Sequence, residues 1–111
     1  MSVLPRLLGD QEVSAGDLSE TAAVLRALSH PARLRLLRHL AHASGQIATV
    51  GQLARRMDLA HSTVSQHLAR LAVMGLITKH PSGHEIFCVL APEALARIAA
   101  FLTPTDPTET P

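Results

Sequence analysis

Aromatic residues are scarce in this 111-residue sequence, which has no tryptophan, no tyrosine and two phenylalanines, Phe87 and Phe101. A core of leucine, alanine, valine and isoleucine with so few large rings suits packed helices better than a β-sandwich or a barrel. We therefore expect one mainly α-helical domain. At this length it would gain stability by burying further surface in an oligomer.

Cysteine is also scarce, since Cys88 is the only one in the chain. A single cysteine excludes an intramolecular disulfide and is typical of a reducing compartment, so we expect a buried thiol rather than a redox sensor. The first ten residues, MSVLPRLLGD, have too short an apolar run for a signal peptide or a membrane span. The sequence thus predicts a soluble, cytoplasmic protein.

Acidic residues are nearly absent from the middle of the chain, where Asp58 is the only one between residues 26 and 79. The formal net charge of +1 hides how basic this segment is. Its basic residues are Arg26, Arg33, Arg35, Arg38, Arg55, Arg56, Arg70 and Lys79. Lysine and arginine concentrated in this way are expected of a surface that neutralises DNA phosphates.

Two short helical patterns separated by a tight turn occupy residues 49–72, with the sequence TVGQLARRMDLAHSTVSQHLARLA. Thr49 and Gln52 have the spacing of a capping box at the start of the first helix. Apolar residues at helical spacing predict the buried faces, namely Val50, Leu53, Ala54 and Met57 in the first helix and Val64, Leu68 and Leu71 in the second. Because residues 58–60 leave room only for a turn, we interpret the segment as a helix-turn-helix.

The face of the second helix opposite its apolar stripe carries no acid. Small or hydrogen-bonding side chains on such a face can enter the major groove of double-stranded DNA and contact base edges. We predict base contacts by Ser62, Thr63, Ser65 and Gln66, and phosphate contacts by Arg55, Arg56, Arg70 and Lys79. The alternative is a protein-interaction module that keeps this fold without binding DNA, and the basic middle of the chain argues against it.

A β-hairpin is predicted directly after the helix pair. Residues 76–80 and 84–90 have strand-like patterns around the turn signal at residues 81–83, and Gly75 has the character of a helix end. A hairpin in this place is a wing, on which we expect His80 and His84 to face each other. One edge strand is also expected at residues 46–48.

The remaining helices are predicted on either side of this unit, within a domain at residues 18–102. Ser19 is expected to cap a first helix that ends near Leu28. A second helix should then run from Ala32 to Ala43, with an inner face made by Leu34, Leu37, Leu40 and Ala41. Residues 1–17 are predicted to be either a flexible arm or an extra turn packed on a partner, and residues 103–111 a disordered tail rich in proline and threonine.

The last helix, ending at Leu102, is apolar over nearly its whole circumference. A terminal helix with two apolar faces needs two partners, so we predict that it packs both on its own domain and on a second copy of the chain. The first helix is its expected companion in a homodimer interface made by Leu25, Leu28, Leu95, Ile98 and Leu102.

Seven histidines raise the question of a metal effector. His39 and His42 are three residues apart on a predicted exposed helix face, and His80 and His84 are close together at the hairpin, so either pair is a candidate for Ni²⁺ or Zn²⁺. Two ligands do not make a sensor site, and exposed histidines are usually only solvated. No enzyme is predicted, because the sequence has no HExxH motif, no glycine-rich phosphate loop and no carboxylate spaced to orient a base.

Three runs of the sequence together resemble the ArsR/SmtB family of bacterial winged-helix regulators: ALSHPARLRLLRHL, QLARRMDLAHSTVSQHLARLAVMGLI and SGHEIFCVL. The resemblance covers roughly residues 27–90. It implies a homodimer that binds a palindromic operator near a promoter, usually as a repressor released by an effector, and many members sense metals. A co-regulator protein is a further candidate partner, and the N-terminal arm could become ordered either on DNA or on such a protein.

The sequence departs from the pattern of this family at positions that concern metals and the turn. Residues 49–51 are Thr-Val-Gly where thiolate-site members have Cys-Val-Cys, and the last helix has Ala, Leu, Ile and Arg97 where other members place Asp and His ligands. Neither common metal site of the family is therefore expected. Asp58 and Ala60 replace the usual glycine and capping serine of the turn, so the recognition helix should begin less firmly.

Overall fold

The structure, a computed structural model, describes residues 15–104. Its elements in chain order are the helices α2 (Ala15–Leu28) and α3 (Pro31–Ala41), the 3-10 turn η1 (Ser44–Gln46), strand β1 (Ile47–Thr49), helices α4 (Val50–Met57) and α5 (His61–Val73), strands β2 (Ile77–Ser82) and β3 (Glu85–Leu90), and helix α6 (Pro92–Leu102). The strands form one antiparallel sheet in the order β1-β3-β2. The predicted winged helix-turn-helix is confirmed.

The two ends of the chain are covered only in part by the described residues. The expected N-terminal arm at residues 1–17 lies outside them apart from its last three residues, which belong to α2, and most of the expected tail at residues 103–111 also lies outside. The prediction that Ser19 caps the first helix is wrong, because α2 has already begun at Ala15.

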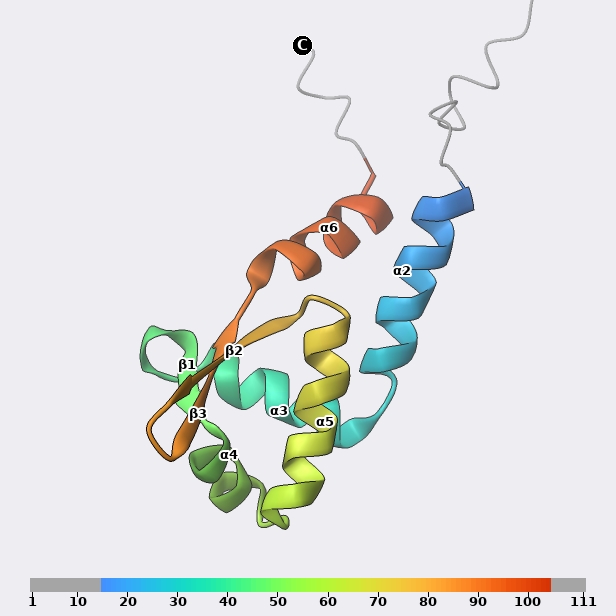
Figure 1. The fold of residues 1–111 in the computed structure, drawn as a ribbon. Coiled ribbons are helices and arrows are strands. Elements are labelled where there is room, and N and C mark those ends of the chain that lie inside the picture. Colours follow the sequence, from blue (N-terminus) through green and yellow to red (C-terminus); the bar gives the residue numbers. More distant parts are fainter. Residues whose placement is uncertain (1–14, 105–111) are drawn as a thin grey trace, which may run out of the picture.

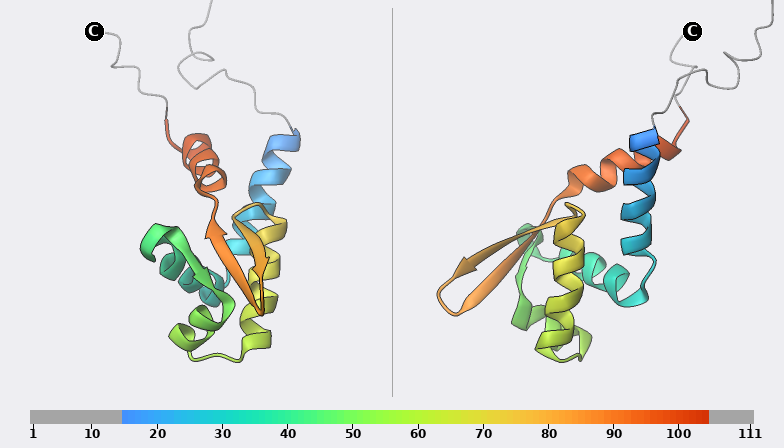
Figure 2. Two further views of the ribbon diagram at one scale, coloured as in Figure 1. Left: turned by 60° about the vertical axis from the view of Figure 1, so that its left-hand side comes forward. Right: turned by 45° about the vertical axis from the view of Figure 1, so that its right-hand side comes forward.

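Helices α3, α4 and α5 pack around a common core beside the small sheet (Figure 1). The fully buried side chains come from all of these elements and include Leu36, Leu40, Leu53, Leu68, Leu71, Leu76 and Ile77. Helices α2 and α6 lie at the end of the molecule opposite the turn between α4 and α5, and the β2–β3 hairpin extends beyond the helices (Figure 2). No helix within the described part of the chain combines the length and apolar character that a membrane crossing requires.

The inner face of helix α3 differs in part from the one expected, since Leu37 and Leu40 are buried as predicted but Leu34 and Ala41 are exposed. Leu34 is 52% exposed, whereas Leu36 is completely buried beside Leu37 and Leu40. The true stripe is Arg33, Leu36, Leu37 and Leu40, at helical spacing, and it begins with a charged residue. The half-buried Arg33 guanidinium donates two hydrogen bonds inside the protein, so an arginine occupies a position where the pattern predicted an apolar residue.

The wing turns two residues later than expected. Ser82 pairs with Glu85, so the loop consists of Gly83 and His84, and Gly83 has a φ of 61° that suits glycine. This register places Phe87 opposite His80. The expectation that His80 faces His84 is therefore wrong. Instead, the His80 Nε2 atom is hydrogen-bonded to the Thr78 hydroxyl oxygen at a distance of 2.9 Å.

The phase of α3 can be tested with two leucines on the same helix. We expect Leu36→Ala to lower the free energy of unfolding by about 2–5 kcal/mol, because it leaves a cavity in the core. Leu34→Ala should cost about 0.5 kcal/mol or less, since its side chain is largely solvated. Urea unfolding followed by circular dichroism measures both values, and equal losses would contradict the assignment of the buried face.

Candidate nucleic-acid interface

Helix α4 starts directly from the sheet, with Thr49 as the last residue of β1 and the N-cap of the helix. The Thr49 hydroxyl accepts a hydrogen bond from the Gln52 backbone N–H at 3.0 Å, and Gln52 Oε1 accepts one from the Thr49 N–H at 2.9 Å. The predicted capping box is confirmed. Because Thr49 also pairs with Phe87 of β3, the box ties the start of the helix pair to the wing.

The turn between the two helices depends on Asp58, which adopts the left-handed conformation with φ 55° and ψ 47°. Aspartate tolerates this region better than most residues. The Leu59 N–H then donates to the Ala54 carbonyl at 3.1 Å and closes the end of α4. Helix α5 begins after Ala60 without a side-chain cap, as the replacement of the family's serine led us to expect.

Helix α5 buries Val64, Leu68 and Leu71 and thereby turns its opposite face outward, as predicted. The predicted base-contacting residues all lie away from the core: Ser62 and Gln66 are exposed, and Thr63 and Ser65 are half-buried. No acidic residue occurs in the helix. The outer face of α5 is therefore a hydrogen-bonding surface without acidic residues, with Arg70 exposed in the last turn of the helix.

The predicted phosphate contacts are distributed over three elements rather than gathered in one patch. Arg70 is exposed on α5, Lys79 is exposed on β2, and Arg55 and Arg56 are exposed on α4. The two α4 arginines line a cavity on the α3 and β1 side of their helix, to which α5 contributes no residue. Arg55 and Arg56 therefore lie both among the candidate phosphate contacts and in the lining of this cavity.

A polar cluster that the sequence analysis missed holds the inner side of α5 against the start of α3. Arg33 donates from Nη1 to the Ala27 carbonyl at 2.9 Å and from Nε to His67 Nδ1 at 3.4 Å. The His67 ring packs on the His30 ring with centroids 4.7 Å apart, and His30 Nδ1 accepts the Ala32 N–H at 3.1 Å. Arg33, which we considered with the basic middle of the chain, thus has an internal role.

The pKa of His67 lies below its ordinary value of 6.5, first because of burial and then because of the neighbouring His30 and Arg33. A proton on His67 would bring a second positive charge beside the Arg33 guanidinium. The neutral ring is therefore the form that suits the packing of α5 on α3.

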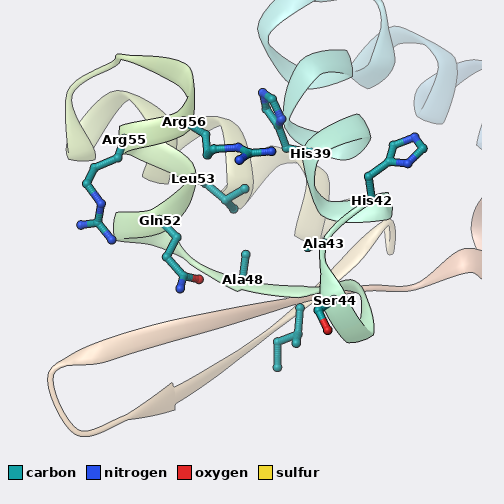
Figure 3. A pocket seen from close by; sticks show the side chains of 10 residues that line it. His39, His42, Ala43, Ser44, Ala48, Gln52, Leu53, Arg55 and Arg56 are labelled. Atoms are coloured by element: carbon teal, nitrogen blue, oxygen red, sulfur yellow. The ribbon is translucent and has the colours of Figure 1, made fainter.

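The histidine candidates for a metal do not converge in the part of the chain that the structure describes. The rings of His39 and His42 point in different directions (Figure 3), and His84 lies in the hairpin loop while His80 lies within β2. Among residues 15–104, no three His, Cys, Asp or Glu side chains gather as a metal-binding group. Cys88 is buried in β3, and burial raises the pKa of its thiol, which confirms the expected structural thiol.

Comparison with known proteins gives matches over most of this architecture. Residues 28–80 match a protein family described as a helix-turn-helix domain. The chain is similar to the HTH-type transcriptional regulator YgaV of Escherichia coli K12, with 40% identity over 83 residues that make up 75% of this chain and 82% of YgaV.

Two solved structures share the fold over a similar length. One is the homodimeric winged helix-turn-helix DNA-binding domain from Mycobacterium bovis, a possible ArsR-family transcriptional regulator, with a TM-score of 0.67 and 28% identity over 85% of this chain and 84% of that one. The other is the antimony-specific transcriptional repressor AntR, with a TM-score of 0.70 and 27% identity over 92% of this chain and 91% of that one.

The His67 cluster predicts how stability depends on pH. Because the pKa of His67 is lower in the folded chain than its ordinary 6.5, the unfolded chain binds the proton more readily. The stabilising contribution of neutral His67 is therefore complete above about pH 6.5 and declines as the pH falls from there through the folded-state pKa. His39, whose pKa is also lowered, acts in the same direction.

Urea unfolding on both sides of pH 6.5 should show this decline, and His67→Gln should make it shallower. Proton NMR of the His67 ring gives a direct measurement, with the urea-unfolded chain as the reference. A His67 midpoint equal to or above that of the unfolded chain would contradict the assignment.

Proposed function

Since the chain belongs to the ArsR family of DNA-binding transcriptional regulators and is not an enzyme, we propose that it represses transcription as a homodimer bound to a palindromic operator. The observation that carries this proposal is the acid-free outer face of α5, which is turned away from the core. A helix presented in this way fits the major groove.

Individual residues are proposed for two kinds of contact. Ser62, Thr63, Ser65 and Gln66 contact base edges, and Gln66 is the best placed of these, because it is exposed and its amide matches the two hydrogen-bonding groups that adenine presents in the major groove. Phosphate contacts come from Arg55, Arg56, Arg70 and Lys79. His80 and His84 on the wing lie near the neighbouring minor groove, where they add little charge at neutral pH.

The proposal is tested by fluorescence anisotropy with the DNA upstream of the protein's own gene and with random DNA, at two salt concentrations. We expect Gln66→Ala to cost operator binding about 1–3 kcal/mol and to leave random-DNA binding nearly unchanged. Lys79→Ala should weaken both kinds of binding and reduce the salt slope by about one, because one phosphate contact is lost.

The outcomes separate the two roles and the two functions. If Gln66→Ala weakened both DNAs equally while Lys79→Ala affected only the operator, the role assignment would be reversed. If the unmodified protein bound neither DNA in a salt-dependent way, the protein-interaction module would replace DNA binding as the function. Ni²⁺ or Zn²⁺ in a parallel arm tests a metal effector, since a metal-dependent change in operator affinity would point to the histidine pairs.

The homodimer is proposed to form through α2 and α6, which carry large exposed apolar side chains at one end of the molecule (Figure 1). Leu102 is 63% exposed and Leu18 is 52% exposed, with Leu25 and Phe101 also at the surface. A groove of about 250 Å³ separates the two helices at the end of α5, and Ile98 lines it. Leu28 and Leu95 pack partly on the chain's own core, so they contribute less to the interface than their positions in the sequence indicated.

Leu102→Glu should convert the dimer into a monomer, because it would bury a carboxylate in an apolar interface without a partner. Leu59→Glu is the matched control, since Leu59 is also exposed but lies in the turn at the opposite end of the molecule. Size-exclusion chromatography with light scattering gives the mass of each variant. A dimer that persists in Leu102→Glu, or is lost equally in Leu59→Glu, would exclude this interface.

A further inference from the structure

A cavity of about 600 Å³ lies between the end of α3, strand β1 and helix α4. Its volume is within the range of sites for small molecules, about 300–1,000 Å³. Ile47, Ala48 and Leu53 supply an apolar part of the lining, and Arg55, Arg56 and His39 supply a polar part. A cavity with these two parts suits a ligand that is itself half apolar and half polar.

The polar part of the lining is entirely basic or neutral, and no acidic residue contributes to it. Figure 3 shows the Arg56 side chain directed from α4 toward His39 on α3, while Arg55 lies on the outer side of α4. Neither guanidinium is paired with a carboxylate among residues 15–104. The cavity therefore presents positive charge without a counter-charge, which favours an anion.

His39 provides a second observation at the same cavity. Its Nε2 atom is buried and has no hydrogen-bond partner. Among residues 15–104, no other side-chain nitrogen or oxygen atom is in this situation. The pKa of His39 is lowered first by burial and then by Arg56, Arg35 and Arg38. A buried polar atom that lacks a partner is unfavourable, and an oxygen anion between His39 and Arg56 would satisfy both groups.

We propose that this cavity binds a small organic carboxylate, whose oxygens accept hydrogen bonds from Arg56 and His39 while its apolar body lies on Ile47, Ala48 and Leu53. An arginine fork matches a carboxylate well. A phosphate is a poorer match for the whole cavity, because the apolar lining has no counterpart on a phosphate.

The regulatory consequence rests on the proposed function. In that function Arg56 contacts a DNA phosphate, so a carboxylate that holds Arg56 beside His39 removes this contact. The ligand also bridges α3 and α4 and so acts on the first helix of the helix-turn-helix. We expect the bound ligand to lower operator affinity about five-fold or more, in the usual range for coupling between two sites.

The test uses benzoate as the probe and benzamide, its uncharged isostere, as the control. Binding to the full-length protein is followed by two-dimensional NMR without DNA. Benzoate should bind at least about ten-fold more tightly than benzamide, as expected for charge-assisted hydrogen bonds, and should shift signals from α3, β1 and α4. Arg56→Gln and His39→Gln should each weaken benzoate binding several-fold, whereas Arg26→Gln, which removes the same charge as Arg56→Gln from outside the cavity, should not.

The proposal would be overturned by equal binding of benzoate and benzamide, by signal changes outside these three elements, or by equal losses in Arg56→Gln and Arg26→Gln. Inorganic phosphate binding as tightly as benzoate would assign the cavity to phosphate instead. Operator binding is measured separately with and without benzoate. A protein that binds benzoate but no DNA would refute the proposed function alone, and one that binds operator but no benzoate would refute this inference alone.

Discussion

The double role of Thr49 constrains the arrangement of the wing and the helix pair. This residue is 4% exposed, ends β1 and caps α4 at the same time, so no loop separates the sheet from the helix-turn-helix. Its pairing with Phe87 fixes β1 on the wing strand, and its reciprocal bonds with Gln52 fix the first turn of α4. The wing and the first helix of the pair are therefore held as one unit, and α5 is positioned against that unit by its buried stripe. A surface made of a helix and a wing needs this fixed relation, because both parts must meet one duplex together.

The sequence predicted the elements whose burial follows a simple period. All seven apolar positions expected in α4 and α5 are buried. Each helix has one face on the core, and the short turn between them fixes how the two helices are rotated relative to each other. The inner face of helix α3 was predicted correctly only at Leu37 and Leu40, because the half-buried Arg33 takes one position of the stripe and a pattern based on hydrophobicity does not include a charged residue. The late turn of the wing was missed because Pro81 and Ser82 look like turn residues, yet both lie in β2, an edge strand, where a proline is tolerated.

The candidate interface was predictable from the same periodicity, whereas the sites that depend on contacts between distant residues were not. Gln66 and Ser62 face outward because Val64 and Leu68 face inward, and that inference needs only the sequence of α5. His67 and Arg33 are 34 residues apart, so their contact follows from how α3 packs on α5. The basic middle of the chain likewise concealed distinct roles, because Arg33 is used internally, Arg56 faces a cavity, and Arg70 and Lys79 remain on the outer surface.

Helix α3 connects these separate sites. Near its start, Arg33 bonds to His67 on the inner side of α5, and near its end, His39 lines the cavity that Arg56 shares from α4. Helix α3 also packs on both helices of the pair through Leu36, Leu37 and Leu40. Because a short helix with a close-packed face moves as a rigid body, a ligand that draws its last turn toward α4 would also shift Arg33 relative to His67. The recognition helix would then change its angle to the wing without any change in its own side chains. In this arrangement a ligand in the cavity between α3, β1 and α4 would control DNA binding.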